Sequence, residues 1–208
     1  METIVVATGN PGKLGEIREV LGDLSVSVLG LKDLTPIEEP EETGRTFAEN
    51  ARDKAVYYAE KTNLPCLADD SGLEVDALNG APGVHSARFA AGEVAPDAPR
   101  PAIDAANNAK LLNALADVPE EKRTARFVCH LALAADGEIL LEARDTIEGR
   151  IARSPAGDNG FGYDPLFVVP EKGCTTAQLP PEQKNAISHR GKAVRTFAAK
   201  LQEYLAKQ

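Results

Sequence analysis

The N-terminal segment most constrains the fold, because it has the pattern of a strand that passes directly into a helix. An apolar run rich in β-branched residues, Thr3 to Ala7, leads into a polar stretch with two glycines, Thr8 to Lys13. Leu14, Ile17 and Leu21 then recur at helical spacing. The segment therefore predicts a buried strand joined by a tight turn to an amphipathic helix, as at the start of a βα unit.

Strand-like and helix-like runs continue to alternate along the chain. Strands are expected at Val26–Leu29, Leu64–Ala68, Ala125–Ala135, Ile139–Ile151 and Leu166–Val169, and helices at Thr46–Thr62, Asn107–Leu115 and Ser188–Leu205. Asp136-Gly137 predicts a hairpin turn between the two longest strands. The stretch Ala90–Ala105, which is rich in alanine and proline, is expected to form a surface loop. This mixture predicts an α/β fold with a mixed sheet.

Composition narrows the classes of function. A chain of 208 residues, 43% of them hydrophobic, can bury a core in one domain or in two closely joined lobes. It has no apolar run long enough to cross a membrane and no signal-peptide pattern. The net charge of -9 disfavours binding to DNA or RNA. Cys66, Cys129 and Cys174 form neither a disulfide nor a zinc pattern, so we expect buried thiols in a reducing cytoplasm.

The turn Thr8-Gly9-Asn10-Pro11-Gly12-Lys13 has features of a phosphate-binding site. Asn10 can cap the helix, and Pro11 suits the first helical position. The glycines let backbone N–H groups approach an anion, and Lys13 adds a positive charge. The spacing is neither that of a Walker A loop nor that of a dinucleotide-binding loop. The alternative interpretation is a well-capped turn that binds nothing.

Two acidic stretches could supply metal-binding or base chemistry. Asp69-Asp70-Ser71-Gly72 follows an apolar run, and carboxylates at a strand end can hold Mg²⁺ or deprotonate an attacking water. The alternative is a turn in which these side chains cap local backbone groups. The acidic loop Glu38 to Gly44 could add a second metal carboxylate or could simply be solvated. In the helix that follows, Asn50, Asp53 and Lys54 could face the same site.

A glycine-rich loop, Gly157 to Pro165, could recognise a flat ligand. Its glycines let the backbone bend closely round such a ligand, and either Phe161 or Tyr163 could stack on a base. The alternative is a tight loop that is held by packing of these two aromatic rings.

The stretch Lys184 to Lys192 is the one dense cationic segment of this acidic sequence. Lys184 and Arg190 could donate hydrogen bonds to a phosphate or a carbonyl oxygen, with His189 as an additional donor. The alternative is a basic helix terminus without a ligand.

Taken in order, five motifs resemble those of the inosine/xanthosine triphosphate pyrophosphatase family: TGNPGK, FAENARDKA, LADDSGLEVDALNGAPGVHSARFA, GFGYDPLF and EQKNAISHRGKA. The resemblance extends from about Ile4 to Leu205. It implies an α/β fold in which a mixed, twisted central sheet is flanked by helices, with two lobes around a long cleft, in a single domain over residues 1–208. It also implies a homodimer that uses Mg²⁺ to hydrolyse ITP, dITP and XTP to the monophosphate and pyrophosphate.

The resemblance implies roles for individual residues. Asp70 corresponds to the catalytic acid, which accepts a proton and binds Mg²⁺. Glu41 corresponds to the second metal carboxylate, with the neighbouring Glu42 as the alternative. The expected substrate-binding residues are Thr8, Gly9, Asn10, Pro11, Gly12, Lys13, Ser71, Phe161, Gly162, Tyr163, Asp164, Lys184, His189 and Arg190.

Base choice is expected to depend on hydrogen-bond polarity. A donor such as Arg190 or His189 would pair with the 6-oxo group of hypoxanthine or xanthine and would clash with the 6-amino group of adenine. Two differences from the family stand out. The Ala90–Ala105 loop is longer and richer in proline, and Asp158-Asn159 replaces commonly small residues and could alter base preference.

Two other functions share these residues. A pyrophosphatase for pyrimidine or modified nucleotides would use the same phosphate and metal chemistry. A nucleotide-binding protein without turnover would keep the same contacts. In every case the expected partner is a small-molecule nucleotide, rather than a nucleic acid or a membrane.

Overall fold

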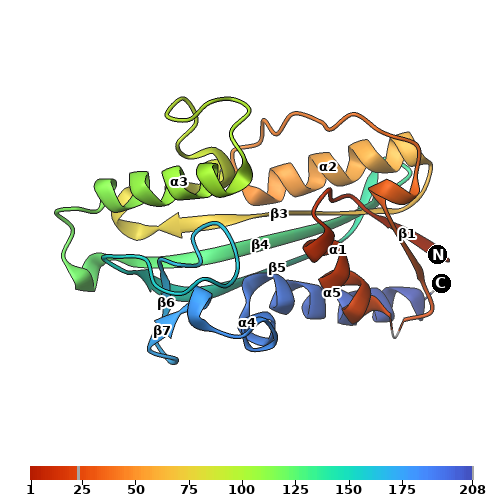
Figure 1. Ribbon diagram of the computed structural model, residues 1–208. Coiled ribbons are helices and arrows are strands. Elements are labelled where there is room, and N and C mark those ends of the chain that lie inside the picture. Colours follow the sequence, from red (N-terminus) through yellow and green to blue (C-terminus); the bar gives the residue numbers. More distant parts are fainter. Residues whose placement is uncertain (23, 208) are drawn as a thin grey trace. The chain divides into compact units, whose positions relative to one another are not determined.

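The computed structural model describes residues 1–22 and 24–207. Its helices are α1 (Pro11–Leu21), α2 (Phe47–Thr62), α3 (Arg100–Ala114), α4 (Pro181–Ile187) and α5 (His189–Leu205). Its strands are β1 (Thr3–Val6), β2 (Ser27–Gly30), β3 (Cys66–Val75), β4 (Thr124–Ala135), β5 (Glu138–Ile151), β6 (Phe167–Val169) and β7 (Cys174–Thr175). Figure 1 shows these elements in colours that follow the chain.

The described strands form one sheet in the order β2-β1-β3-β4-β5-β6-β7. β1 runs parallel to both β2 and β3, whereas β6 runs antiparallel to both β5 and β7. The expected α/β fold with a mixed sheet flanked by helices is therefore confirmed.

The chain divides into two compact units, which share strands β3, β4 and β5. One unit comprises Met1–Ser71, Cys129–Asp145 and His189–Gln208, and the other comprises Gly72–Val128 and Thr146–Ser188. The expectation of a single domain with a long cleft stays a prediction.

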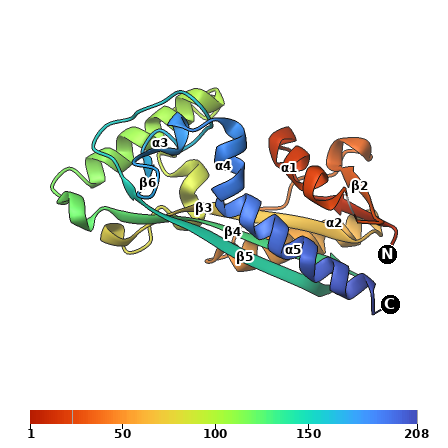
Figure 2. The same cartoon turned by 90° about the horizontal axis from the view of Figure 1, so that it is seen from below.

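In the first unit the sheet is buried on both faces, and each strand divides its side chains between them. Ile4, Val6 and Leu67 pack with α1 and α5, together with Leu131 and Leu133 of β4. The side chains that follow them in the sequence face α2, and these are mostly small: Val5, Ala7, Ala68, Ala132 and Ala134. Figures 1 and 2 show α2 on one side of these strands and α1 with α5 on the other. Burial on both faces explains why these strands are near-continuous apolar runs in the sequence.

Local sequence signals account for the helix starts in this unit. The Asn10 side chain accepts hydrogen bonds from the N–H groups of Gly12 and Lys13, as expected for the N-cap of α1. At α2, Thr46 and Glu49 form the reciprocal capping box. Both predicted caps are confirmed, so the turn after β1 and the start of α2 have defined backbone directions.

The second unit has a separate core. Apolar side chains of the shared strands, among them Leu73, Phe127 and Ile147, pack against Leu111 and Leu115 from α3 and the residue after it. Tyr163, Leu166 and Phe167, which lie in and after the glycine-rich loop, complete this core. The loop is therefore anchored at its C-terminal end by burial of apolar side chains.

Three predicted boundaries differ from the structure. β3 does not end before Asp69-Asp70-Ser71-Gly72 but continues through it to Val75. α3 begins at Arg100 rather than Asn107, because Pro101 occupies the first helical turn, where its missing N–H costs nothing. The last residues of the expected Ala90–Ala105 loop are thus helical. Lys184 lies in a separate short helix, α4, and the closing helix begins at His189.

The hairpin prediction is confirmed. Asp136 and Gly137 both have positive φ, 53° and 78°, as the tight turn between β4 and β5 requires. Cys66 and Cys129 are buried and Cys174 is half-buried, all as free thiols. Among the described residues, no helix combines the length and apolarity needed to cross a bilayer.

Candidate active site

The two adjacent aspartates of β3 serve opposite faces of the sheet. Successive side chains of a strand alternate in direction, so Asp69 lies on the same side as Leu67, toward α1 and α5. Asp70 lies on the side of Ala68, toward α2. Both are nearly buried, with 4% and 8% of the residue surface exposed. One dipeptide therefore places carboxylates in two different environments.

Asp69 is surrounded by cations from both ends of the chain. Its Oδ2 accepts a hydrogen bond from Lys13 Nζ at 2.7 Å and lies 3.7 Å from Arg190 Nε. Ser71 Oγ donates to the same oxygen at 3.3 Å and accepts from Arg190 Nη2 at 3.2 Å. Arg190 Nη1 also lies 3.7 Å from Glu16 Oε2 in α1. The first turn of α1, the middle of β3 and the start of α5 are thus joined by charge.

These charges determine how the group is ionised. Burial by itself would raise the pKa of Asp69, but the charges of Lys13 and Arg190 outweigh burial and hold that pKa below its usual range. Burial likewise opposes the charge of Arg190, yet the Asp69 carboxylate keeps the arginine pKa raised. Arg190 Nε is buried and has no hydrogen-bond partner among the described residues. It is an unused donor next to a cluster of charges.

On the other face, α2 presents two polar side chains to Asp70. Asn50 Nδ2 donates to Asp70 Oδ2 at 2.9 Å, and Lys54 Nζ lies 3.6 Å from Asp70 Oδ1. The Gly44 N–H donates to Asn50 Oδ1 at 2.8 Å, and this contact directs the Asn50 amide nitrogen at Asp70. The prediction that Asn50 and Lys54 face the acidic stretch is confirmed, whereas Asp53 is exposed.

Burial raises the pKa of Asp70, although Lys54 and the hydrogen bond from Asn50 oppose the rise. Burial would lower the pKa of Lys54, but the Asp70 carboxylate and other nearby acids outweigh it, and the pKa is raised. A carboxylate with a raised pKa accepts a proton more readily, which is the property that a general base needs. The pair is therefore a charged lysine beside a basic carboxylate.

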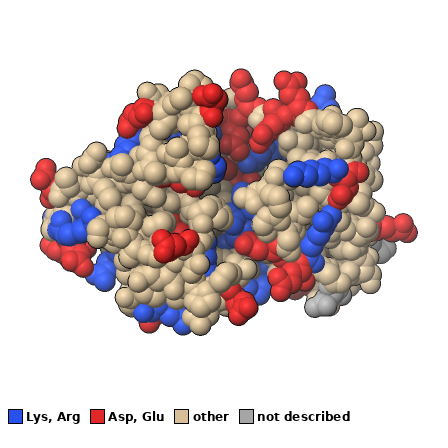
Figure 3. All heavy atoms as spheres, in the orientation of Figure 1, with Lys and Arg blue, Asp and Glu red and all other residues tan. Residues whose placement is uncertain are grey.

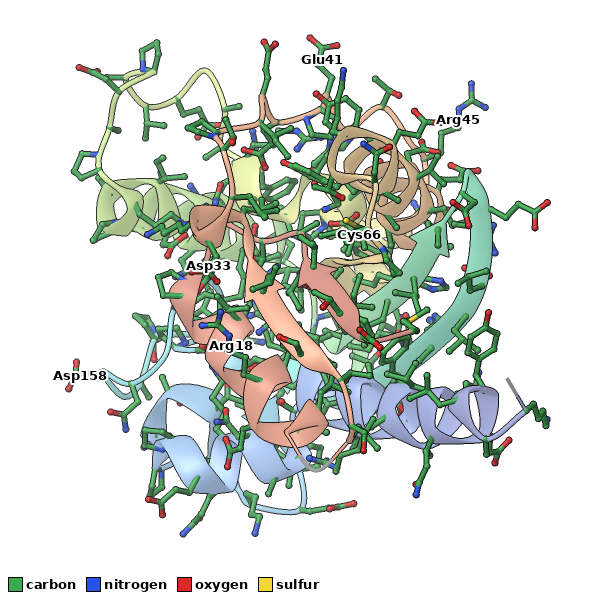
Figure 4. The ribbon with its side chains drawn as sticks, turned by 90° about the vertical axis from the view of Figure 1, so that its right-hand side faces the viewer. Arg18, Asp33, Glu41, Arg45, Cys66 and Asp158 are labelled. Carbon is green, nitrogen blue, oxygen red and sulfur yellow. The ribbon has the colours of Figure 1, made fainter. Side chains whose placement is uncertain are left out.

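The structure places Glu42, rather than Glu41, beside this pair. Glu42 Oε1 accepts from Lys54 Nζ at 2.7 Å, so the lysine ammonium lies between the carboxylates of Glu42 and Asp70. Glu41 is exposed, and Figure 4 shows its side chain directed outward. The close approach of this loop to α2 requires glycine at position 44, because a Cβ there would lie 2.5 Å from Asn50 Oδ1.

The turn after β1 lies beside the same part of β3. The paired register of β1 and β3 ends at Val6 and Leu67, and the Ala7 N–H still bonds to the Leu67 carbonyl. Asp69 and Asp70 therefore lie just beyond the end of β1, where the chain enters the Thr8–Lys13 turn. Ligand sites of α/β proteins typically form at such strand ends.

The glycine-rich loop belongs to the second unit and is organised around Asp164. Asp164 Oδ2 accepts from the Phe161 N–H at 2.7 Å and from Lys184 Nζ at 2.6 Å, and Oδ1 accepts from Thr176 Oγ1 at 2.9 Å. A Cβ on Gly160 would overlap with Asp164 Oδ2, so only glycine fits there. Both oxygens of Asp164 thus hold the loop, and Lys184 is joined to it from α4.

The two aromatic residues of the loop differ in exposure. Tyr163 is buried, and its hydroxyl donates to the Ser86 carbonyl at 2.9 Å. Phe161 is 50% exposed and is the large apolar side chain that the loop presents to solvent. The Lys184 ammonium lies 4.9 Å from the centre of its ring. Phe161 is accordingly the ring that can stack on a ligand, while Tyr163 serves the core.

Asp158 and Asn159 also behave differently from each other. Asn159 Nδ2 donates to the Leu179 carbonyl at 3.1 Å and so stabilises the loop. Asp158 is exposed, and Figure 4 shows its side chain projecting away from the fold. Asn159 therefore acts on the backbone of its own unit.

Two charged residues of this site were not predicted as such: Asp69 had no role separate from Asp70, and Glu16 had none. A signal for Asp69 existed, because two adjacent acids in an extended strand must face opposite sides. Glu16 lies one helical turn after Lys13, which puts both on one face of α1. His189 begins α5, next to Arg190.

These features define a class: an α/β protein whose buried carboxylates and cations, beside a capped βα turn, suit a phosphorylated ligand. The chain belongs to the Ham1 family, whose sequence profile matches residues 4–200. The dITP/XTP pyrophosphatase of Geobacter sulfurreducens is 53% identical over 93% of this chain and 94% of its own. The dITP/XTP pyrophosphatase of Exiguobacterium sibiricum is 50% identical over 97% of this chain and 98% of its own. A HAM1 protein structure from Coxiella burnetii covers 98% of this chain and 100% of its own, with 44% identity and a TM-score of 0.88.

Breaking the buried ion pair of Asp69 is expected to destabilise the first unit far more than breaking an exposed pair of equal length. Asp69→Asn should lower the free energy of unfolding by about 3 kcal/mol, because it leaves buried Arg190 without its main counter-charge. Urea unfolding followed by circular dichroism measures the change. Asp33→Asn is the matched control. Asp33 lies 2.7 Å from Arg18, as Asp69 lies 2.7 Å from Lys13. The side chains of Asp33 and Arg18, which are labelled in Figure 4, are both over 40% exposed. Equal losses in the two variants would contradict the expectation.

Proposed function

We propose that this chain hydrolyses dITP, ITP and XTP to the nucleoside monophosphate and pyrophosphate, and so removes non-standard purine nucleotides from the precursor pool. The observation that carries the proposal is the difference between the surroundings of two neighbouring carboxylates of β3. Asp69 contacts cations, whereas Asp70 lies beside a lysine that also contacts a second carboxylate. The names of the related dITP/XTP pyrophosphatases support the same reaction and the same substrates.

The cations around Asp69 bind the phosphates in this proposal. Lys13 is 21% exposed at its side chain and can turn from Asp69 to a phosphate oxygen. Arg190 Nε, a buried donor without a hydrogen-bond partner among the described residues, supplies a second contact. Positive charge here neutralises the pyrophosphate that leaves when water attacks the α-phosphorus. Asp69 keeps both cations in place before the substrate arrives.

Asp70 takes the proton of the attacking water. Its raised pKa makes the carboxylate a better proton acceptor, and Lys54 keeps it from becoming protonated too easily. Asn50 fixes the orientation of the carboxylate by its hydrogen bond to Oδ2. Oδ1 accepts from the Ser71 N–H at 3.0 Å and keeps a second lone pair for the water. The proton moves to Asp70 as the new P–O bond forms and the bond to the leaving pyrophosphate breaks.

The donor set also suits a divalent cation. The Lys54 ammonium already lies between carboxylate oxygens of Glu42 and Asp70, so a positive charge is accommodated there. No group of three histidine, cysteine or acidic side chains among the described residues could hold a metal by itself. The two carboxylates of Glu42 and Asp70 suit Mg²⁺, because this ion binds to one or two carboxylates and takes its other ligands from water and phosphate. When bound by Asp70 and Glu42, Mg²⁺ would neutralise charge on the phosphates.

The loop of the second unit is proposed to contact the base. Phe161 offers an exposed ring for stacking, and Gly162 lets the backbone approach. A hydrogen-bond donor such as His189 would pair with the 6-oxo group of hypoxanthine or xanthine and reject the 6-amino group of adenine. Arg190, by contrast, is surrounded by Ser71, Asp69 and Glu16, which favours a role at the phosphates.

We further propose a cytoplasmic homodimer with a small-molecule nucleotide as its partner. The free, mostly buried cysteines support a reducing compartment. The net charge of -9 disfavours nucleic acid, and Figure 3 shows acidic and basic side chains interspersed over one face.

A product assay tests the reaction and the substrate class together. With Mg²⁺, ITP, dITP and XTP should yield monophosphate and pyrophosphate, while GTP, ATP and dTTP should react far more slowly. Adenine lacks the 6-oxo acceptor, guanine carries a 2-amino group that hypoxanthine and xanthine lack, and thymine is not a purine. Chromatography resolves monophosphate, diphosphate, pyrophosphate and phosphate. Diphosphate with phosphate would mean attack at the γ-phosphorus. Turnover of dTTP alone would indicate a pyrimidine enzyme, and binding without turnover would indicate a nucleotide-binding protein.

Asp70→Asn is expected to bind dITP but to lose turnover. The amide keeps the shape of the side chain but accepts no proton, so kcat should fall by about 10²- to 10⁴-fold. Equilibrium dialysis with dITP measures binding in the same variant. Asp53→Asn, an exposed acid on α2, should match the wild type. Near-normal turnover by Asp70→Asn would exclude Asp70 as the base.

Replacing one carboxylate at a time by an amide shows whether Glu42 or Glu41 binds Mg²⁺. Glu42→Gln should raise the Mg²⁺ concentration needed for half-maximal activity by about tenfold, comparable to the loss when groups around a metal are changed. Glu41→Gln should leave it unchanged, because that side chain is exposed. A magnesium titration of initial rates measures both. The reverse pattern would make Glu41 the ligand.

A further inference from the structure

α3 holds the glycine-rich loop by both peptide groups of Gly162. The Gly162 N–H donates to Asp104 Oδ2 at 3.0 Å, and its carbonyl oxygen accepts from Asn108 Nδ2 at 2.9 Å. Asp104 and Asn108 are four residues apart, so they lie on the same side of α3. Gly162 has a φ of 62°, a left-handed conformation that glycine adopts without strain. We call these three residues the Gly162 clamp.

The clamp and Asp164 together determine where Phe161 points, because Asp164 Oδ2 accepts from the Phe161 N–H at 2.7 Å. The Gly162 N–H belongs to the peptide after Phe161, and the Gly162 carbonyl belongs to the peptide before Tyr163. Fixing both peptides therefore fixes the backbone on each side of the glycine. Tyr163 is anchored separately through Ser86 and the core. The clamp thus acts chiefly on the half-exposed ring of Phe161.

α3 is a firm support for this clamp. In its middle, buried Asn107 Oδ1 accepts from the Ala90 N–H at 2.7 Å. Beyond its C-terminal end, buried Arg123 donates to the carbonyl oxygens of Leu115 at 2.6 Å and Ala152 at 3.0 Å. Because the helix is fixed at both places, the positions of Asp104 and Asn108 are set by the core of the second unit.

Packing alone does not explain polar residues at these positions. Asp104 Oδ1 and Asn108 Oδ1 are both buried without a hydrogen-bond partner among the described residues. Arg100 Nε, 2.9 Å from Asp104 Oδ1, balances only the charge of the carboxylate. Leucine at position 108 would fill similar space without desolvating an amide. Asparagine at position 108 differs from leucine in that it can donate the hydrogen bond to the Gly162 carbonyl.

We propose that Asp104 and Asn108 are positioning residues for purine recognition, which they influence through Gly162 and Phe161 without touching the substrate. This inference rests on the proposed function, in which the loop lies against the base. The base is remote from the reacting phosphorus, so loss of the clamp weakens nucleotide binding and base discrimination but spares the phosphate contacts. KM therefore rises more than kcat falls.

Steady-state kinetics with dITP and dGTP test the inference, with inorganic tripolyphosphate as a competitor that carries no base. Asn108→Leu and Asp104→Ala should raise KM for dITP about tenfold, the effect of one hydrogen bond to a group left buried. Their kcat should change less than about twofold, and their preference for dITP over dGTP should fall. The inhibition constant of tripolyphosphate should stay that of the wild type.

Two variants control for general damage. Asp104→Asn should restore most of the wild-type KM, because an amide oxygen still accepts from the Gly162 N–H. Asn113→Leu, on an exposed position of the same helix, should behave as the wild type. If Asn108→Leu does not fold, the isosteric Asn108→Asp replaces it, since a carboxylate facing the Gly162 carbonyl also abolishes the bond.

Hydrogen exchange over residues 158–166, without nucleotide, separates this inference from the proposed function. Faster exchange in Asn108→Leu and Asp104→Ala than in Asn113→Leu supports the clamp. Unchanged exchange, an unchanged KM, or a tripolyphosphate constant that rises in parallel with KM overturns it. A wild-type protein that releases no monophosphate from dITP, whatever the exchange result, refutes the proposed function instead.

Discussion

The buried carboxylate of Asp69 is the constraint on which the first unit depends. A charge with 4% of its residue surface exposed is tolerated only if cations surround it, and these come from Lys13 and Arg190, near opposite ends of the chain. Satisfying this one group fixes the turn after β1 and the start of α5 relative to β3. The proposed phosphate contacts are therefore assembled by the same interaction that makes the strand tolerable.

Asp70 is also a buried carboxylate, but its surroundings shift its pKa in the opposite direction. Its surroundings are an amide, a lysine and a second carboxylate, so that burial and like charge raise its pKa while Lys54 limits the rise. Two chemically identical neighbours thus acquire pKa values shifted in opposite directions, because the pleat of β3 exposes them to different helices. Such a separation of pKa values is typical of groups that take different roles in one reaction.

Sequence signals that act over a few residues made much of the fold predictable. The features that were missed depend on partners far away in the sequence. The β1–α1 turn, the α2 capping box and the Asp136-Gly137 hairpin follow from rules that operate within a few residues, and each is confirmed. The path of β3 through Asp69 was missed because aspartate, serine and glycine favour turns, and the cations that make a strand possible lie far away in the sequence. The early start of α3 was hidden by prolines, and with it the contacts of Asp104 and Asn108 to Gly162.

The alternation of side chains along β3 also has an evolutionary consequence. Inserting or deleting one residue between Leu67 and Asp69 would exchange the faces on which the two carboxylates lie, and would also turn Leu67 or Ala68 toward the wrong helix. No single substitution elsewhere could compensate for such a shift of register. Length variation among descendants of this sequence should therefore be confined to surface connections such as the segment before α3, while β3 keeps a fixed number of residues.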